Sequence, residues 1–260
     1  MKKTLIALTV TISAAVSGSA MAAFQTGGVS GSVDIGGNLN PVSTVNPWEA
    51  EIGVAASGLN AEMGVGATNA TINVTNAIPV LGIRTTTNDA FQGGAGISPQ
   101  VSYGNTVSFA SAVNGVGVLT LDVKDKATSN KIGSMTAPFY AGAVISESLK
   151  DGSGATKLSI YASDRGNAFY GGVPAVSGMV DPDPETNVTT LSAAYTANFN
   201  LQNATVNTSS KTSLNNKGKM YSGYYGSGIL PGSTISITLD SGFNGATEWA
   251  AQLPVTVSYQ

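Results

Sequence analysis

The sequence predicts an all-β protein built as a β-sandwich, and three observations support this. Apolar and polar residues alternate with a period of two in many short runs, which is typical of half-buried strands. Clusters of Gly, Pro and Asn, which favour turns, separate these runs. The composition suits strands and turns as well, because the chain has 32 glycines and only 7% aromatic residues. A single domain of this length is reasonable for a sandwich.

The predicted strands succeed one another along the chain. In the first, Val29, Gly31, Val33 and Ile35 share one face. In the last, Leu253, Val255, Val257 and Tyr259 share one face. Further alternating runs lie at residues 71–75, 116–123, 157–161 and 234–239. Turn clusters lie at residues 36–38, 93–94, 151–154, 231–232 and 241–242.

The first 22 residues have the pattern of a secretory signal peptide. Lys2 and Lys3 precede an apolar run over residues 5–16, and small residues come next, up to Ala22. The run is too short to span a membrane, and the alternative of a buried N-terminal helix fits these flanks less well. We therefore expect cleavage after Ala22 or Ala23 and export to the periplasm.

Residues 174–219 depart from the alternating pattern and predict an excursion from the sandwich made of loops and a short helix. The segment 181–185 is rich in proline and predicts a turn. Apolar residues in 191–201 recur at helical spacing, whereas 207–219 is polar and predicts a loop. Long excursions on a rigid β scaffold often carry the function.

The composition excludes several kinds of chemistry. Without cysteine or histidine there is no disulfide, thiol nucleophile, Ser-His-Asp triad or zinc site of the usual kind. The formal net charge of −3 gives no basic surface for nucleic acid. Asp181, Asp183 and Glu185 are clustered oxygens of the type that binds Ca²⁺, but the interleaved prolines favour a solvated turn. We expect no enzyme activity, no catalytic residue, no cofactor and no metal.

The two ends of the expected mature chain allow two interpretations. The segment 23–35 ends in an alternating strand that Gly36 and Gly37 detach from the rest of the chain, and the chain ends on another alternating strand. Both can be ordinary strands of one sheet. Alternatively the sandwich is incomplete, and the N-terminal strand of one copy fills a groove in the next copy by strand addition.

Scattered segments resemble one bacterial family in matching order. They are residues 31–37, 48–49, 169–172, 221–228 and 248–260, together with the signal peptide. On these residues the chain resembles the FaeG/ClpG-type fimbrial subunits and adhesins, which are assembled by the chaperone–usher pathway. The match is weakest over 174–219, which is shorter here.

The resemblance implies an incomplete immunoglobulin-like sandwich that donor-strand exchange completes, with residues 23–36 as the donor extension and 37–260 as the pilin domain. In the donor strand, Val29, Gly31, Val33 and Ile35 would face the groove. A periplasmic chaperone would first lend its own strand to the one formed by Leu253, Val255, Val257 and Tyr259. The outer-membrane usher would then exchange that strand for the donor of the next subunit, which yields an extracellular fimbrium on the bacterial surface.

The resemblance also implies a lectin-like adhesin that binds host glycoconjugates. In FaeG-type adhesins an aromatic residue and a nearby acid contact sugar; the matching positions here are Tyr161 and Ser163. The aromatic residue is kept and the acid is not, although Asp164 is adjacent, and Arg165 and Asn167 could also reach a ligand. Tyr161 could instead pack in the core. The departure leaves a non-adhesive minor or structural subunit as an alternative, and a self-contained secreted binding module or enzyme as a further one.

Overall fold

The structure, a computed structural model, describes residues 45–260. The predicted signal peptide (1–22) and the predicted donor residues Val29, Gly31, Val33 and Ile35 lie outside the described residues. Within 45–260, no helix is long and apolar enough to cross a membrane.

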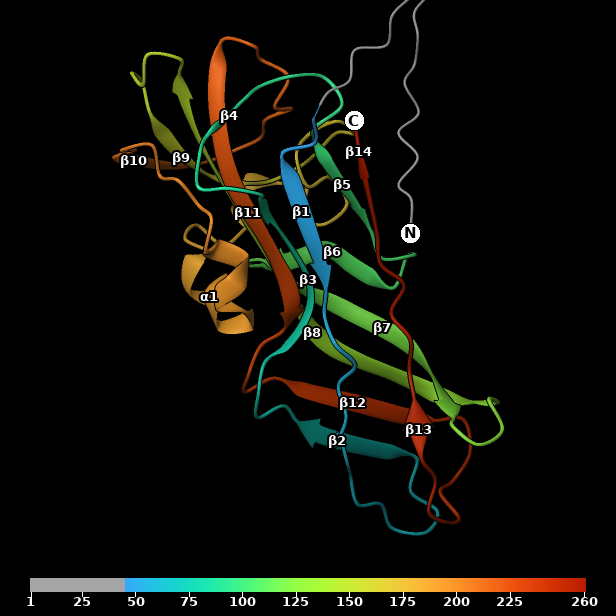
Figure 1. The fold of residues 1–260 in the computed structure, drawn as a ribbon. Coiled ribbons are helices and arrows are strands. Elements are labelled where there is room, and N and C mark those ends of the chain that lie inside the picture. Colours follow the sequence, from blue (N-terminus) through green and yellow to red (C-terminus); the bar gives the residue numbers. More distant parts are fainter. Residues whose placement is uncertain (1–44) are drawn as a thin grey trace, which may run out of the picture. The chain divides into compact units, whose positions relative to one another are not determined.

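The described chain is dominated by strands, with one short α-helix (Figure 1). The strands are β1 Trp48–Ile52, β2 Asn69–Asn73, β3 Ile78–Thr85, β4 Phe91–Gln92, β5 Pro99–Ser102, β6 Val107–Val113, β7 Val116–Asp125, β8 Lys131–Leu149, β9 Thr156–Ile160, β10 Val206–Ser210, β11 Lys219–Ile229, β12 Thr234–Leu239, β13 Trp249–Ala250 and β14 Thr256–Tyr259. The predicted all-β class is confirmed, and the alternating runs that fall on described residues coincide with β2, β7, β9, β12 and β14.

The long strand β8 belongs to both layers of an immunoglobulin-like arrangement. Its first part pairs with β7 and β12, and β12 pairs with β2. Its second part pairs with β11 and β9, and β11 continues to β3 and β1. The strands of the first group run across those of the second in Figure 1. Strands β5 and β14 form a separate two-stranded sheet.

The main core lies between these layers. Fully buried side chains from β3, β8 and β11 meet there, among them Leu81, Ile83, Phe139, Ile145 and Tyr225. Apolar burial of this extent is the dominant stabilising term for the fold.

A second, smaller core lies on the other face of β8 and β11. It joins Tyr140, Val144 and Tyr224 from the strands to Val188, Leu191 and Tyr195 from the excursion. The helix α1 (Glu185–Leu191) and the 3₁₀ turn η2 (Ala193–Thr196) after it supply the excursion residues. A Cβ at Gly82 would overlap the ring of Tyr195, so the absence of a side chain there allows this close packing.

The structure corrects two expectations for the excursion. The helix lies at Glu185–Leu191, and residues 191–201 contain only the short 3₁₀ turn η2. Residues 207–210, expected as part of a polar loop, belong to β10, which pairs in parallel with β9. Tertiary pairing to an existing strand edge has overridden the weak local preference of this polar segment.

The turn before α1 is fixed by the carboxylate of Asp181. Asp181 Oδ2 accepts hydrogen bonds from Tyr140 Oη and Asn187 Nδ2, both at 2.9 Å. The neighbouring carboxylates of Asp183 and Glu185 pair with Lys157 Nζ at 2.9 and 3.3 Å. These contacts anchor the excursion. Among residues 45–260, no three acidic side chains are grouped so as to hold a metal ion.

Candidate functional site

Among residues 45–260, the C-terminal strand β14 is hydrogen-bonded to another strand along one edge only. Leu253, Val255, Val257 and Tyr259 are half-buried against the main core, while the residues between them are exposed. The ladder to β5 extends from Thr256 to Tyr259, shorter than the predicted run from 253. Pro254 has no N–H to donate, which fits a ladder that begins after it. Within residues 45–260, the opposite edge of β14 pairs with no strand.

The strand β1 presents an uncovered apolar face toward the same core. Trp48 is buried there, donates from Nε1 to the carbonyl of Ile97 at 2.7 Å, and packs edge-on against Phe169. Because side chains alternate along a strand, Ala50 and Ile52 lie on the same face as Trp48. Both are nevertheless exposed, Ile52 at 64%. Residues 45–260 therefore do not close the core over this end of β1.

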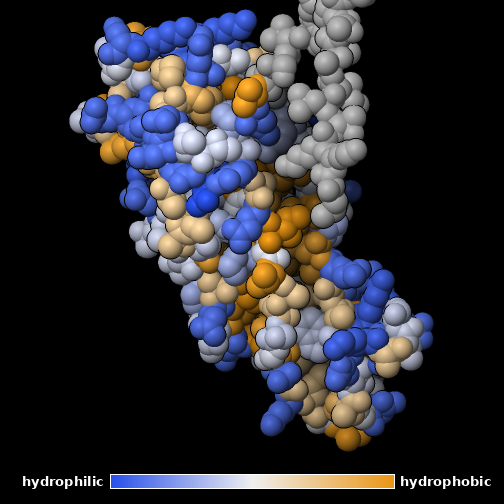
Figure 2. All heavy atoms as spheres, viewed as in Figure 1, coloured by the Kyte–Doolittle hydropathy of each residue, from blue (hydrophilic) through white to orange (hydrophobic). Residues whose placement is uncertain are grey.

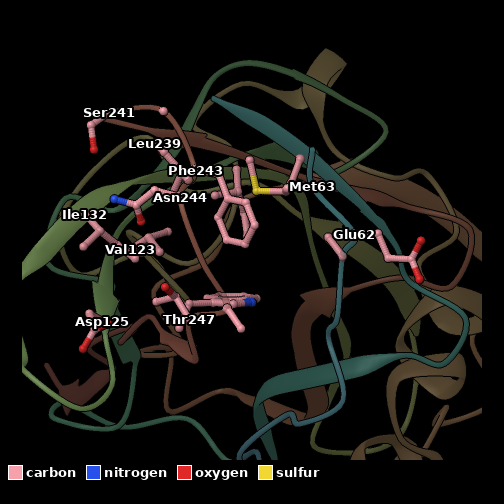
Figure 3. Close-up of a pocket in the computed structure, with 16 residues that line it drawn as sticks. Glu62, Met63, Val123, Asp125, Ile132, Leu239, Ser241, Phe243, Asn244 and Thr247 are labelled. Carbon is pink, nitrogen blue, oxygen red and sulfur yellow. The ribbon is translucent and has the colours of Figure 1, made fainter. Parts of the chain in front are cut away.

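A cavity of about 740 Å³ lies beside β13, where the C-terminal segment begins. Apolar side chains from β7, β12 and their surroundings line it, as do Met63, Phe243 and Trp249. Met63 and Phe243 point into this cavity in Figure 3. Trp249 Nε1 donates to the carbonyl of Leu59 at 3.2 Å, which ties the segment between β1 and β2 to the C-terminal segment.

We define the groove as the inner face of β1, the half-buried row of 253–259 and the cavity beside β13, which all have residues in contact with the main core. Figure 2 shows apolar residues gathered in a stripe beside the end of β1. Contiguous exposed apolar surface of this kind marks a site of interaction. Among residues 45–260, β14 has one edge without a strand partner, which is the kind of edge to which another strand can pair.

The second candidate site is the loop after β9, which carries all the residues predicted to contact sugar. Tyr161 comes directly after β9 and is half-buried, so its ring is neither fully exposed for a sugar to stack on nor part of the core. Ser163, Asp164 and Arg165 are exposed, and Asn167 is half-buried. The backbone N–H of Tyr161 donates to the carbonyl of Ser210 at 3.1 Å, which joins this loop to the end of β10.

Lys211, which sequence reasoning missed, completes a polar cluster with Ser163 and Asp164. Its Nζ lies 2.8 Å from Ser163 Oγ and 2.8 Å from Asp164 Oδ2, and Ser163 Oγ donates to that same oxygen at 2.7 Å. The hydrogen bond from Lys211 lowers the pKa of Asp164, and the same bond raises the pKa of Lys211. The cluster offers a cation, a carboxylate and a hydroxyl close to the ring of Tyr161, groups that suit sugar hydroxyls.

The remaining two predicted residues have different positions. Asn167 Oδ1 accepts a hydrogen bond from the backbone N–H of Asp164 at 3.1 Å. The side-chain amide oxygen of Asn167 therefore helps to close the loop. Arg165 is exposed and makes no hydrogen bond or ion pair with another described residue. The structure thus brings Tyr161, Ser163 and Asp164 together, with Arg165 at the rim.

Comparisons with known proteins agree on one family. The family of fimbrial major and minor subunits of the K88 type matches residues 1–260. Two curated relatives from Escherichia coli, K88 fimbrial proteins AC and AB, are 31% and 30% identical to this chain, and each alignment covers both chains entirely. The F41 fimbrial protein of Escherichia coli is 27% identical, again over the whole of both chains.

Proposed function

The chain belongs to the K88 family of fimbrial major and minor subunits, and from this premise we propose that it polymerises by donor-strand complementation. Residues 23–36 of one copy fill the groove between β1 and the C-terminal segment of the next. The observation that carries the proposal is the half-buried row Leu253, Val255, Val257 and Tyr259 on a strand with one unbonded edge among residues 45–260. Fimbriae are extracellular surface appendages, which fits the signal pattern at residues 1–22.

The donor segment supplies what the groove lacks. Its N–H and C=O groups pair with the free edge of β14, and Val29, Val33 and Ile35 cover the apolar row and the inner face of β1. Each such side chain contributes ~1.5–3 kcal/mol when fully buried. Gly31 leaves space for a close approach of the two backbones.

Before polymerisation the same edge needs temporary protection. A periplasmic chaperone lends a strand to β14, and the outer-membrane usher exchanges it for the donor of the next subunit. The free edge and the uncovered apolar stripe support this, because such surfaces otherwise aggregate.

Adhesion to host cell-surface glycoconjugates is the second part of the proposal. The lectin-like surface is the loop with Tyr161, Ser163, Asp164 and Arg165, closed by Asn167 and extended by Lys211. Its exposed cation, carboxylate and hydroxyl support this role. The alternative, a non-adhesive minor or structural subunit, is favoured by one observation: the carboxylate of Asp164 is already paired with Lys211.

Polymerisation is tested with a matched pair of full-chain variants co-expressed with the cognate chaperone and usher. Val33→Asp places a carboxylate on the inward face of the donor strand, whereas Ser32→Asp places it on the outward face. We expect electron microscopy to show fibres for Ser32→Asp and chaperone-bound subunits without fibres for Val33→Asp. Normal fibres from Val33→Asp, or from a chain lacking residues 23–35, would refute the donor role.

Adhesion is tested on a glycan array with assembled fibres. Wild-type fibres are expected to bind a defined set of glycans, and Tyr161→Ala fibres to lose that binding while assembling normally. Leu201→Ala, on the exposed part of the excursion, serves as the control. Wild-type fibres that bind no glycan, or Tyr161→Ala fibres that bind as wild type does, would favour the non-adhesive alternative.

A further inference from the structure

The strand β5 lies between the C-terminal strand and the loop that carries the candidate sugar contacts. On one side it pairs with β14, from Thr256 opposite Ser102 to Tyr259 opposite Pro99. On its other side the carbonyl of Pro99 accepts the N–H of Phe169 at 2.7 Å, and the N–H of Val101 donates to the carbonyl of Tyr170 at 2.8 Å. The loop therefore continues the small sheet as an irregular third strand.

One buried side chain of β5 holds the tip of this loop. Gln100 Nε2 donates to the carbonyl of Asn167 at 2.9 Å, and Gln100 Oε1 accepts the N–H of Gly166 at 3.0 Å. Gln100 is 7% exposed, so both bonds are shielded from water. Gly166 has a φ of 89°, a conformation that L side chains rarely adopt, so a glycine is favoured at the position whose N–H Gln100 binds.

The small sheet that supports this loop has a free edge among residues 45–260. Among residues 45–260, β5 and β14 make a sheet of two strands that is separate from the main sheet. A further strand paired to β14 would add a ladder of hydrogen bonds on the side opposite the loop. Within the described chain, the other edge of β14 pairs with no strand.

We propose that filling the groove beside β14 orders the loop over residues 163–170, and that Gln100 is the positioning residue that couples the two. The proposal rests on donor-strand completion as proposed above. A donor strand stabilises β14, and β14 holds β5 in register. The two side-chain hydrogen bonds of Gln100 then fix the positions of Gly166 and Asn167. Sites coupled in this way bind with positive cooperativity, because the first event removes disorder that the second would otherwise have to remove. The surface around Asp164 is then fully formed only in the assembled fibre.

The test measures amide hydrogen exchange by mass spectrometry on the full mature chain carrying Val33→Asp, which cannot donate its own strand. A synthetic peptide with the sequence of residues 23–36 is added to fill the groove. We expect it to slow exchange in β14 and, by about tenfold, in residues 163–167. In a chain that also carries Gln100→Met, the peptide should still slow β14 but leave the loop unchanged. Gln202→Met is the matched control. Gln202 makes a comparable set of hydrogen bonds, to Ser146 and Ser148, and these partners belong to β8, which does not pair with β5.

The outcomes separate the two proposals. If the peptide fails to slow β14, donor-strand completion is refuted, and the coupling falls with it. If β14 is slowed and the loop is not, the coupling alone is refuted. Should the Val33→Asp chain not stay folded, wild-type and Gln100→Met fibres are compared directly. Faster loop exchange with unchanged β14 exchange in the Gln100→Met fibres supports the coupling, and equal loop exchange overturns it.

Discussion

Replacing Val188 by alanine should loosen the excursion without touching the groove. Val188 is fully buried in the small outer core, packed among Tyr140, Val144 and Tyr224, and its Cγ1 approaches Gly226 so closely that a Cβ there would lie 2.6 Å away. The substitution removes two buried carbon groups, worth ~0.8 kcal/mol each by transfer alone. A cavity term adds to this, because the surrounding β8 and β11 cannot collapse, and brings the cost to ~2–3 kcal/mol.

That cost corresponds to a roughly 30- to 150-fold increase in local opening of α1, since about 1.4 kcal/mol is a factor of ten. Amide exchange in assembled fibres measures it, with the exposed neighbour Thr189→Ala as the control. Exchange over Glu185–Leu191 should rise in Val188→Ala alone, while fibre yield stays at the wild-type level. Loss of fibres in Val188→Ala would refute the reasoning, because it would show that the outer core and the groove are one cooperative unit.

The remaining predictions concern β14, the loop cluster and the buried tyrosines. Val257→Asp should reduce fibre yield at least tenfold, since it places an unpaired carboxylate at the groove, whereas the outward-facing Thr256→Asp should assemble; equal yields would contradict the assigned faces. By NMR, the carboxyl of Asp164 should titrate below its ordinary pKa and move upward in Lys211→Met. Because the pKa of Asp164 is lower in the folded than in the unfolded chain, the pair with Lys211 stabilises the fold above about pH 4, and this contribution is lost as the pH falls through the folded pKa. An unchanged titration of Asp164 in Lys211→Met would exclude the pairing. Tyr225→Phe should destabilise the subunit by ~1–3 kcal/mol in urea unfolding, because its hydroxyl donates to the carbonyl of Gly172 at 3.0 Å inside the core; a wild-type midpoint would show that this bond contributes nothing.

The sequence identified strands best where one face is buried and the other exposed. The run at 116–123 coincides with β7, whose burial alternates along its length. The longest strand, β8, gave no such signal, because residues 139–146 face the main core on one side and the outer core on the other and are all buried. Strand β11 is hidden for the same reason. Burial on both faces removes the period of two.

The candidate site was predictable only where its residues are close in sequence. Tyr161, Ser163 and Asp164 lie in one short segment and could be proposed together. Lys211 comes from the far end of the excursion, and only the parallel pairing of β10 with β9 brings it beside them. Gln100 is equally remote, and nothing in its local sequence distinguishes it from an exposed polar residue of a short strand.

The strand β1 explains why an excursion and a groove can coexist on one small sandwich. Its outward residue Glu49 pairs with Arg84 at 2.6 Å, and Arg84 Nη1 in turn donates to the carbonyl of Ala194 in the excursion at 2.6 Å. Its inward residues Ala50 and Ile52 face the groove and remain uncovered. Because alternation assigns these contacts to opposite faces of the same strand, the excursion stabilises the outside of the sheet without filling the groove. A strand inserted beside β14 would therefore not compete with α1 for surface.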